Sequence, residues 1–317
     1  MDNRYRIGID LGGTNIKAGI VDRDHKIIAS ASRKTRGERH CGEVLDDMAG
    51  TVKDALQKAG ISLEQCESIG IGSPGTIDHE RGIVIYSNNI RWEQVRLAEE
   101  IKQRLSLPVK VANDANCAAL GEALAGSAKG CKDVVLLTLG TGVGGGVIID
   151  GKLFQGGIGG AELGHTTLIA GGELCTCGRR GCVEAYCSAT ALIREADRAA
   201  EQSPQSLLRK MREEEQEMNG RIPFDAMKAG DKQGTEVVEQ YIQWLGEAVT
   251  NYVNIFRPQM VLLSGGICGQ GALLTEPLKE YVKTHAFAGE RLAIPDIAIA
   301  KLGNDAGIIG AANLQIK

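Results

Sequence analysis

One arrangement of residues occurs twice in this chain: an apolar strand, a turn of glycine and threonine, a second apolar strand and a terminal aspartate. The first copy spans residues 7–22 and contains DLGGTN, and the second spans residues 135–150 and contains LGTGVGGG. Two half-molecules of this kind, each a mixed sheet flanked by helices, would place both glycine turns at strand ends facing one cleft, where α/β folds bind ligands. The alternative is a coincidence between two glycine-rich hairpins.

The rest of the chain alternates strand-like and helical patterns, which is typical of an α/β fold. Short apolar runs predict strands within residues 6–13, 16–22, 25–33, 68–75, 109–113, 134–151, 260–266 and 297–303. Helical patterns cover residues 42–60, 97–105, 115–125, 188–217, 237–256, 271–287 and 305–314. The charged run REEEQE at residues 212–217 is expected to lie on a solvated face.

At 317 residues, the chain is long enough for two domains that each bury a core. We expect an N-terminal α/β lobe over residues 1–120 and a C-terminal α/β lobe over residues 121–302. The final helix, about residues 303–317, is expected to pack back on the N-terminal lobe. No linker rich in proline or serine separates the lobes, so the boundary near residue 120 is inferred from the pattern alone.

Composition restricts the partners of this protein. The 40 acidic and 36 basic residues give a net charge of −4, so there is no excess positive charge to bind nucleic acid. No uncharged apolar stretch reaches the roughly 18 residues of a membrane span, and the N-terminal residues lack the pattern of a secretory leader, which predicts a cytoplasmic protein. Glycine is frequent, with 42 residues, and aromatic residues make up 4%, so we expect backbone groups to bind a small ligand.

The second glycine turn approaches two nucleotide-binding motifs and fits neither. Gly140, Gly142 and Gly145 satisfy G-x-G-x-x-G, but VIID follows as a strand, whereas a dinucleotide motif opens a helix. Gly146–Lys152 approaches a P-loop, but Leu153 stands where the motif needs Ser or Thr. Backbone amides of tight Gly/Thr turns can bind phosphate without a helix, so phosphate binding remains the functional interpretation of both turns.

Side chains beside the two turns support this interpretation. Thr14 and Thr141 would add hydroxyl donors. Asp10 precedes the first turn, and because phosphate repels a carboxylate unless a cation lies between them, Asp10 is a candidate ligand of Mg²⁺ through water. The alternative for each turn is an ordinary hairpin with a solvated aspartate.

Asp114 follows the strand 109–113 and precedes a helix. An aspartate in this position is either a helix N-cap or a carboxylate at a sheet edge where ligands bind. With phosphate-binding turns nearby, it could accept a proton from a substrate hydroxyl during phosphoryl transfer.

His165, Cys175, Cys177 and Cys182 lie within 18 residues of sequence. Three thiolates and one imidazole match a closed structural zinc site, which leaves no open position for metal-activated water. Buried reduced cysteines or a disulfide are the alternatives. The remaining cysteines show no pairing pattern and are interpreted as small buried hydrophobes: Cys41, Cys66, Cys117, Cys131, Cys187 and Cys268.

Together, these residues resemble the ROK family of sugar kinases, and the likeness to its bacterial ATP-dependent glucokinases is close. It covers about residues 6–313 and rests on DLGGTNIK, SPG, NNIRW, VANDANCAALGE, LTLGTGVGGG, GAELGH, CTCGRRGCVE, LLSGG and LGNDAG in this order. The resemblance implies a two-lobed, actin-like (ribonuclease-H-like) ATPase fold with a central cleft, and a homodimer. It also implies a hexose kinase of glycolysis that converts glucose and ATP to glucose 6-phosphate, with Mg²⁺ and a structural Zn²⁺.

The resemblance also assigns roles to single residues. Asp114 would be the catalytic general base. The sugar would contact Gly75, Asn89, Asn113, Asp114, Glu162, His165 and Glu184, with His165 also a zinc ligand beside Cys175, Cys177 and Cys182. The nucleotide and its metal would contact Asp10, Gly12, Gly13, Thr14, Lys17, Thr141, Gly142, Gly265, Gly266 and Asp305.

Other functions within this resemblance remain open. The acceptor could be fructose, N-acetylglucosamine or N-acetylmannosamine, and the donor could be polyphosphate, because the motifs do not separate these substrates. Sugar-responsive repressors carry an added N-terminal helix-turn-helix, for which the residues before Asp10 leave no room. Ala161 departs from the glycine often found before Glu162, which leaves the shape of the sugar pocket open.

Overall fold

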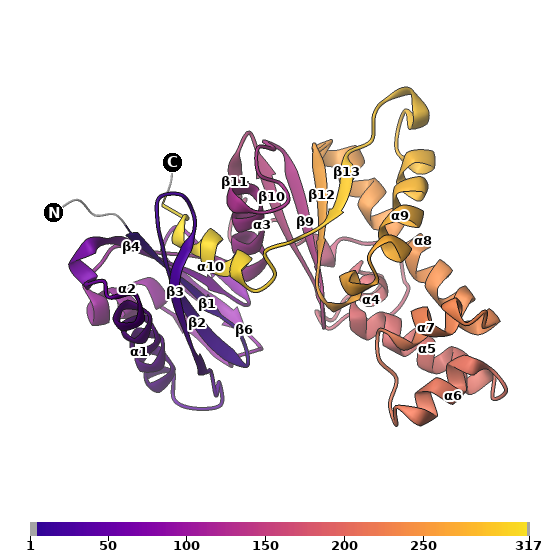
Figure 1. Ribbon diagram of the computed structural model, residues 1–317, viewed down its shortest axis with the longest axis horizontal. Helices are drawn as coiled ribbons and strands as arrows, with labels where there is room; N and C mark the ends of the chain where they lie inside the picture. The colour runs from indigo at the N-terminus through magenta and orange to yellow at the C-terminus, as the bar shows by residue number, and fades with distance from the viewer. Residues whose placement is uncertain (1–4, 316–317) are drawn as a thin grey trace. The chain divides into compact units, whose positions relative to one another are not determined.

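The computed structural model describes residues Tyr5–Gln315, apart from the side chain of Glu290 (Figure 1). Its first sheet has the order β3-β2-β1-β4-β8, in which β1, β2 and β3 pair antiparallel and β1, β4 and β8 pair parallel. The strands are β1 (Tyr5–Leu11), β2 (Asn15–Val21), β3 (Ile27–Lys34), β4 (Cys66–Ser73) and β8 (Val109–Asn113). The predicted N-terminal meander and the two later strands are confirmed. Residues 1–4, where the N-terminal prediction begins, lie outside the described range.

The second sheet has the order β11-β10-β9-β12-β13, with β12 and β13 parallel. Its strands are β9 (Val134–Leu139), β10 (Val143–Ile149), β11 (Lys152–Phe154), β12 (Met260–Ser264) and β13 (Asp296–Ile299). The strands before and after the glycine turn, β9 and β10, occupy the same places in this sheet as β1 and β2 in the first. The common strand order supports a duplicated plan over a coincidence of two hairpins.

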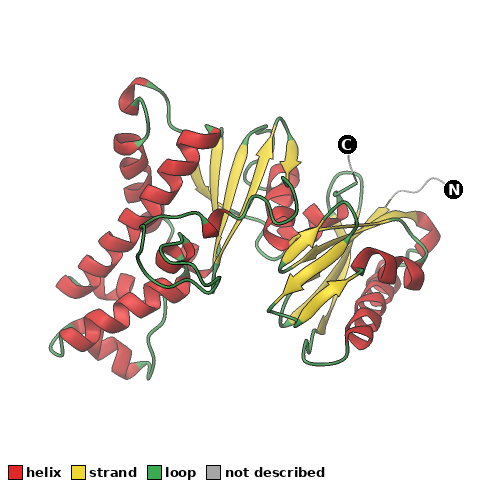
Figure 2. Ribbon diagram, turned by 180° about the vertical axis from the view of Figure 1, so that it is seen from behind, coloured by secondary structure: helices red, strands yellow, loops and turns green. Residues whose placement is uncertain are grey.

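Two helices cover one face of the first sheet, α1 (Cys41–Ala59) and α2 (Leu97–Leu105) (Figures 1 and 2). Val44 and Val52 on α1 are fully buried in one core with Ile9 of β1. Burial of each such side chain contributes about 1.5–3 kcal/mol to the stability of the fold. The residues whose helical spacing predicts α1 therefore also hold this helix on the sheet.

The opposite face of this sheet carries α3 (Asp114–Ala125) and α10 (Asp305–Ala312). Glycines let the backbones approach closely: a Cβ on Gly8 would lie 2.0 Å from the carbonyl oxygen of Ile308, and one on Gly70 would lie 1.7 Å from that of Ala311. The high glycine content therefore serves packing as well as turns. The C-terminal helix is shorter than expected, since it ends at Ala312, and residues 316–317 lie outside the described range.

The other elements include a small three-stranded sheet that the sequence did not predict. It has the order β5-β6-β7 and is formed by β5 (Thr76–Asp78), β6 (Ile83–Ser87) and β7 (Trp92–Val95). The remaining helices are α4 (Glu184–Cys187), α5 (Ala189–Gln202), α6 (Leu207–Glu214), α7 (Ile222–Lys228), α8 (Lys232–Phe256) and α9 (Ala272–His285). The described part of the chain also forms four short 3-10 helices: η1 (Leu63–Gln65), η2 (Leu163–His165), η3 (Gly266–Gln270) and η4 (Gly289–Arg291).

The predicted helix over residues 188–217 is wrong in one respect, because it is two helices. The break between α5 and α6 contains Pro204, which has no N–H for a helical hydrogen bond. Ser206 caps the second helix by accepting a hydrogen bond from Arg209 N. Residues 213–217 are exposed, as expected for the charged run.

The described residues divide into two compact units. The first contains the described residues through Val134, Gly146–Ala161 and those from Ala300 on, and the second contains Val135–Gly145 and Glu162–Ile299. The lobe boundary near residue 120 stays a prediction. Among the described helices, none combines the length and apolar character needed to cross a membrane.

Candidate active site and metal-binding cluster

The first glycine turn joins β1 and β2 and is held by a buried threonine. Gly12 N donates to the carbonyl oxygen of Asn15 at 2.9 Å. Thr35, which is fully buried, donates from Oγ1 to the Gly12 carbonyl oxygen at 2.6 Å and from its backbone N to that of Thr14 at 2.9 Å. Gly13 and Thr14 at the tip are exposed, so the fixed turn presents its groups to a ligand.

Asp10 lies at the base of this turn. It pairs with Lys17 in the β1–β2 register and with Gly72 in the β1–β4 register. Burial raises the pKa of the Asp10 carboxyl, and the charge of Lys17 offsets part of this shift. A Cβ on Gly307 of α10 would lie 3.3 Å from Asp10 Cγ, which places the carboxyl beside the first turn of that helix. A half-buried carboxylate of this kind gains from a nearby cation, and its oxygens suit Mg²⁺.

Asn113, Asp114 and Gly75 lie together where β4 and β8 end. Asn113 is the N-cap of α3: its Oδ1 accepts from Ala115 N at 2.9 Å and from Asn116 N at 3.4 Å. The alternative that Asp114 is the cap is therefore wrong, because Asp114 is the first helical residue. Asn113 Nδ2 donates to the Gly75 carbonyl oxygen at 3.4 Å, which ties the cap to the Ser-Pro-Gly turn.

Asp114 is half-buried at the N-terminus of a 12-residue helix, where the helix dipole favours a negative charge. The fully buried thiol of Cys117 lies one turn further along. Its pKa is raised well above the ordinary value, first by burial and then by the charges of Asp114 and Asp10. Both carboxylates therefore lie near one buried point of the first unit.

Asn89 lies beside the first glycine turn, since a Cβ on Gly13 would be 3.5 Å from Asn89 Cβ. The first unit thus brings together the predicted sugar residues Gly75, Asn89, Asn113 and Asp114 with the predicted nucleotide residues Asp10, Gly12, Gly13, Thr14 and Lys17. Asp305, the first residue of α10, is exposed in the same unit.

The second glycine turn, between β9 and β10, is held from the start of α5. Ala189 N donates to the Gly140 carbonyl oxygen at 2.8 Å, and Thr190 Oγ1 donates to that of Thr141 at 2.9 Å. Gly265, after β12, lies against the same strand, because a Cβ there would be 2.2 Å from the Leu139 carbonyl oxygen. The predicted nucleotide residues Thr141, Gly142, Gly265 and Gly266 are therefore neighbours in the second unit.

Glu184 joins this turn to the cysteine-rich loop. Its Oε2 accepts from Val143 N at 3.1 Å, and its Oε1 accepts from Thr176 Oγ1 at 2.6 Å and from Cys175 Sγ at 3.4 Å. Each carboxylate oxygen has a protein partner, so the predicted sugar contact Glu184 also has a structural role. Thr176, which lies between two predicted zinc ligands, belongs to no motif that would have predicted this contact.

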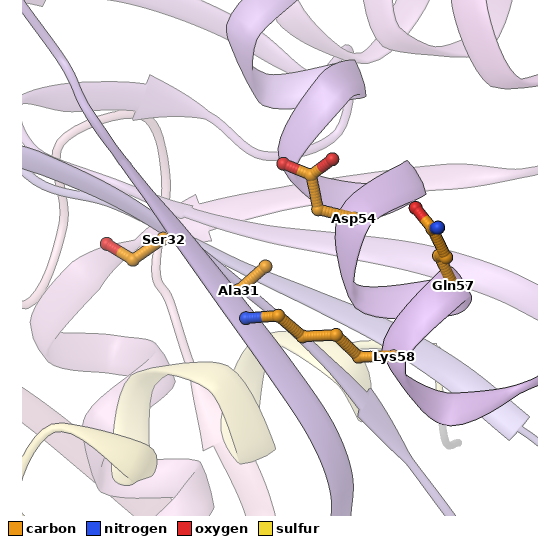
Figure 3. A pocket seen from close by; sticks show the side chains of 5 residues that line it. All are labelled: Ala31, Ser32, Asp54, Gln57 and Lys58. Atoms are coloured by element: carbon orange, nitrogen blue, oxygen red, sulfur yellow. The ribbon is translucent and has the colours of Figure 1, made fainter.

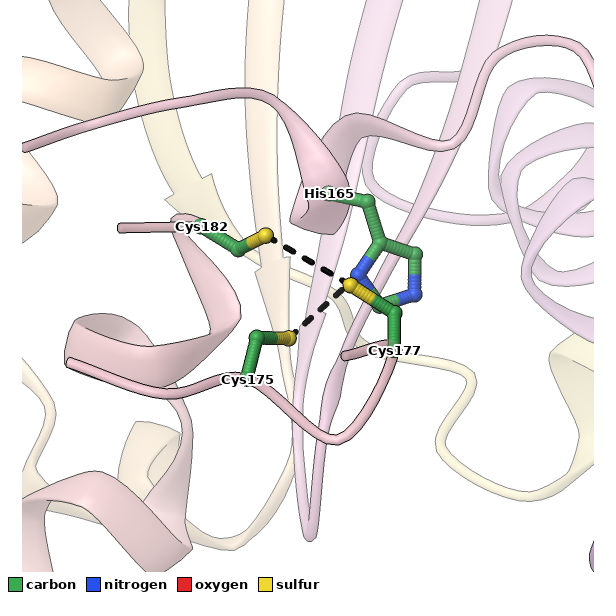
Figure 4. Close-up of side chains that lie close together, drawn as sticks. All are labelled: His165, Cys175, Cys177 and Cys182. Atoms are coloured by element: carbon green, nitrogen blue, oxygen red, sulfur yellow. Dashed lines mark hydrogen bonds between the residues drawn. The ribbon is translucent and has the colours of Figure 1, made fainter. Parts of the chain in front are cut away.

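His165, Cys175, Cys177 and Cys182 form the cluster drawn in Figure 4, with their ligand atoms all within 4.8 Å of one another. The Cys177 and Cys182 sulfurs are 3.7 Å apart, and Cys175 Sγ is 3.6 Å from His165 Nδ1. Two sulfurs on tetrahedral zinc lie about 3.8 Å apart when Zn–S is about 2.3 Å, so this geometry fits a zinc ion. A disulfide would need about 2.05 Å, and every cysteine in the described chain is free.

The protonation of the cluster also depends on a cation. Burial raises the pKa of Cys175 to about 12, and burial likewise raises the pKa of Cys182. Zinc binds thiolates, so its binding would displace these protons. Thiolate sulfur and imidazole nitrogen are common zinc ligands, so the donor set suits zinc in chemistry as well as in spacing.

The short helix η2 carries His165 and follows Glu162. Nδ1 of His165 faces Cys175, so its second ring nitrogen points away from the thiols (Figure 4). Burial raises the pKa of Glu162, an effect that His165 opposes and Glu184 reinforces. Ala161 has a φ of 59°, a left-handed conformation that glycine adopts without strain.

A separate open cavity lies between β3 and α1 (Figure 3). It has a volume of about 510 Å³ and is lined by Ala31, Ser32, Asp54, Gln57 and Lys58. Asp54 pairs with Arg33 at 2.8 Å and Lys58 donates to the Ser30 carbonyl oxygen at 3.2 Å, so its charged groups are already engaged. The cavity contains no residue of the predicted site.

Comparisons with known proteins agree with the motifs. A family model described as the ROK family matches residues 6–317. Glucokinases from Thermotoga maritima and Streptomyces coelicolor are 38% and 35% identical to this chain, and each comparison covers 97% of this chain and 96% of the relative. The crystal structure of a ROK family glucokinase from Streptomyces griseus in complex with glucose and AMPPNP is 34% identical, has a TM-score of 0.81 and covers 98% of both chains.

Proposed function

The chain belongs to the ROK family and is a hexose kinase with the two-lobed actin-like fold of that family, and from this premise we propose that it transfers the γ-phosphoryl group of ATP to the 6-hydroxyl of glucose. The observation that carries the proposal is the position of Asp114. Its carboxylate stands at the start of α3, beside Asn113 and Gly75, in the unit that contains the first glycine turn. The glucokinase relatives favour glucose as the acceptor.

In the proposed reaction, Asp114 accepts the proton of the sugar hydroxyl as its oxygen attacks the γ-phosphorus, and ADP leaves. Asn113 would orient the sugar, because its own amide is fixed by the α3 amides and by Gly75. The main contribution of such a site is to place acceptor and donor in line, with charge stabilised by donors that are already in place. Gly75, Asn89, Glu162, His165 and Glu184 are the other proposed sugar contacts.

The nucleotide would bind the two glycine turns. Amides of Gly12, Gly13 and Gly142 and the hydroxyls of Thr14 and Thr141 are proposed to hold its phosphates, with Lys17, Gly265, Gly266 and Asp305 as further contacts. Asp10 is proposed to hold Mg²⁺ through water, which fits its half-buried carboxylate. When bound, the magnesium ion neutralises phosphate charge.

The cysteine cluster is proposed to hold a structural zinc ion through His165, Cys175, Cys177 and Cys182. The zinc would fix the imidazole through Nδ1, and the other ring nitrogen would then be free to donate to a sugar hydroxyl. A reduced cluster of this kind favours a reducing compartment, so we propose a cytoplasmic protein. The family resemblance supports a homodimer and a place in glycolysis.

The function is tested by measuring ADP formation with Mg-ATP and a panel of glucose, fructose, N-acetylglucosamine and N-acetylmannosamine. The proposal predicts the highest kcat/KM with glucose. A higher kcat/KM with another sugar would mean that this sugar is the acceptor, and the proposed mechanism would stand. If no sugar is phosphorylated with ATP or with polyphosphate, while glucose still binds in calorimetry, the chain would be a sugar-responsive regulator.

A further inference from the structure

The turn that presents Glu162 and His165 is attached to helix α8 through one buried hydroxyl. Tyr252 of α8 donates from its hydroxyl to the Leu163 carbonyl oxygen at 2.6 Å. Thr166 Oγ1 lies 2.8 Å from the same carbonyl oxygen and 3.0 Å from the Tyr252 hydroxyl. Tyr252 is 1% exposed, and burial raises its pKa, so the phenol stays a neutral donor.

The opposite side of this turn is packed against β10. A Cβ on Gly164 would lie 1.9 Å from the Val143 carbonyl oxygen, and one on Gly145 would lie 2.6 Å from Leu163 Cβ. The turn is therefore enclosed by backbone on one side and by the Tyr252 hydroxyl on the other. Loss of the hydroxyl would leave room for Leu163 to move only toward α8.

We propose that Tyr252 is a positioning residue for sugar binding. Its hydroxyl fixes Leu163, and through Leu163 it sets the place of Glu162, the preceding residue, and of the backbone of His165, two residues on. This inference rests on the proposed function, in which Glu162 and His165 contact the sugar. Because a displacement of about 1 Å can cost much of the binding and reactivity of an oriented group, one hydrogen bond behind the site is enough to matter.

The effect should concern the sugar more than the nucleotide or the metal. Tyr252 contacts the carbonyl oxygen of Leu163 and the hydroxyl of Thr166, neither of which is a cluster ligand. The three cysteines come from another segment, and they would keep the His165 ring in place. Glu162 lacks such a second anchor. Burial and the charges of His165 and Glu184 affect the pKa of its carboxyl, and the contacts described for it include no side-chain hydrogen bond.

The same helix offers a matched control. Tyr241 is also fully buried and donates its hydroxyl to a backbone carbonyl oxygen, that of Cys187, at 2.8 Å. Tyr241→Phe and Tyr252→Phe each remove one hydroxyl and one buried hydrogen bond, so each should lower stability to a similar extent. Cys187 ends α4, whose first residue, Glu184, keeps its own hydrogen bonds to Val143 N and Thr176 Oγ1. Only Tyr252→Phe therefore releases the turn that carries Glu162 and His165.

Steady-state kinetics of both variants, with zinc content and thermal unfolding, test the inference. Tyr252→Phe is expected to raise KM for glucose about tenfold, with kcat and KM for ATP nearly unchanged and zinc retained. Tyr241→Phe is expected to keep the KM for glucose. Thr166→Val, which removes the other hydroxyl of the group, should also raise the KM for glucose and serves if Tyr252→Phe folds poorly.

Two outcomes separate this inference from the proposed function. If Glu162→Gln raises the KM for glucose while Tyr252→Phe and Thr166→Val do not, the positioning role is overturned and the sugar contact stands. Equal changes in the KM for glucose in Tyr252→Phe and Tyr241→Phe would also overturn the positioning role, because the loss of stability common to both variants would then explain the effect. A wild-type KM in Glu162→Gln would instead contradict the proposed contact itself.

Discussion

Asp114 and Asn113 are adjacent residues of the same helix start with different tasks. Both residue types cap helices well, so the sequence alone left Asp114 as either a cap or a base. The structure assigns the cap to Asn113, whose Oδ1 accepts from two helix amides. Asp114 is the first residue of the helix, and its Oδ1 accepts from Ala115 N at 2.9 Å.

Asp114→Asn is expected to lower kcat by about 10²–10⁴-fold, because the amide cannot accept the proton of the sugar hydroxyl. The fold should remain, since Asn113 still caps α3. Kinetics with glucose and Mg-ATP measure the loss, and thermal unfolding checks the fold. Turnover close to that of the wild type would remove Asp114 as the base.

The pH dependence of stability in Asp10→Asn tests the role of the second carboxylate, that of Asp10. Burial raises the pKa of Asp10 above its ordinary 3.8, so its contribution to stability is complete below 3.8 and is lost as pH rises through the higher native value. The variant without ligands is therefore expected to lose less stability than the wild type between about pH 4 and about pH 7. Mg-ATP should stabilise the wild type more than the variant.

Chemical denaturation at both pH values, with and without Mg-ATP, measures these differences. An equal or larger loss of stability in Asp10→Asn as pH rises would show that burial does not govern this carboxyl. Equal stabilisation of the two proteins by Mg-ATP would argue against its metal role.

Thr35 and Tyr252 show which site residues sequence reasoning misses. Each acts by one hydroxyl on a backbone carbonyl oxygen that is distant in sequence, Gly12 in one case and Leu163 in the other. Neither residue belongs to a motif, so the sequence carries no sign of either role. The residues of the His/Cys cluster, by contrast, were predictable, because chemistry and close spacing select them together.

Among the elements, those with long regular patterns were predictable. The meander β1–β3 and the helices α1 and α8 each show many residues of one periodicity. The small sheet β5–β7 was missed because its strands have only three to five residues and depend on pairing with one another. Pro204 is the sequence signal for the break between α5 and α6, because proline has no N–H for a helical hydrogen bond.

Helix α10 depends on glycines that face its backbone. Gly70→Ala is expected to lower the free energy of unfolding by about 3 kcal/mol, because its Cβ would lie 1.7 Å from the Ala311 carbonyl oxygen. Gly157→Ala is the matched control, since a Cβ there meets no atom within 4 Å, and it should change stability by less than about 0.5 kcal/mol. Urea denaturation compares the two, and equal effects would contradict close packing as the reason for Gly70.

The cysteine-rich loop should depend on its metal. The wild type is expected to contain about one zinc ion per chain, and Cys177→Ala should lose it together with thermal stability. KM for glucose should rise in the variant, because His165 loses the partner that orients it. Cys131→Ala, outside the cluster, is the control and should keep its zinc. Metal analysis decides the matter, and a wild type without zinc would contradict the assignment.

For the whole molecule, the duplicated plan was visible in the sequence as two glycine turns and appears in the structure as two sheets of the same strand order. The first unit contains Asp114 and the Asp10 turn, and the second contains the second glycine turn and the metal-binding cluster. A sequence can indicate a duplicated strand and turn pattern. The hydrogen bonds within each unit, such as those of Glu184, are visible only in the folded chain.

The proposed reaction is tested most directly by phosphorus NMR of the purified protein mixed with Mg-ATP and glucose. One glucose 6-phosphate is expected for each ADP, with almost no phosphate release when glucose is left out. Free phosphate in place of a sugar phosphate would describe an ATPase. Phosphate on another hydroxyl would contradict the assigned position of transfer.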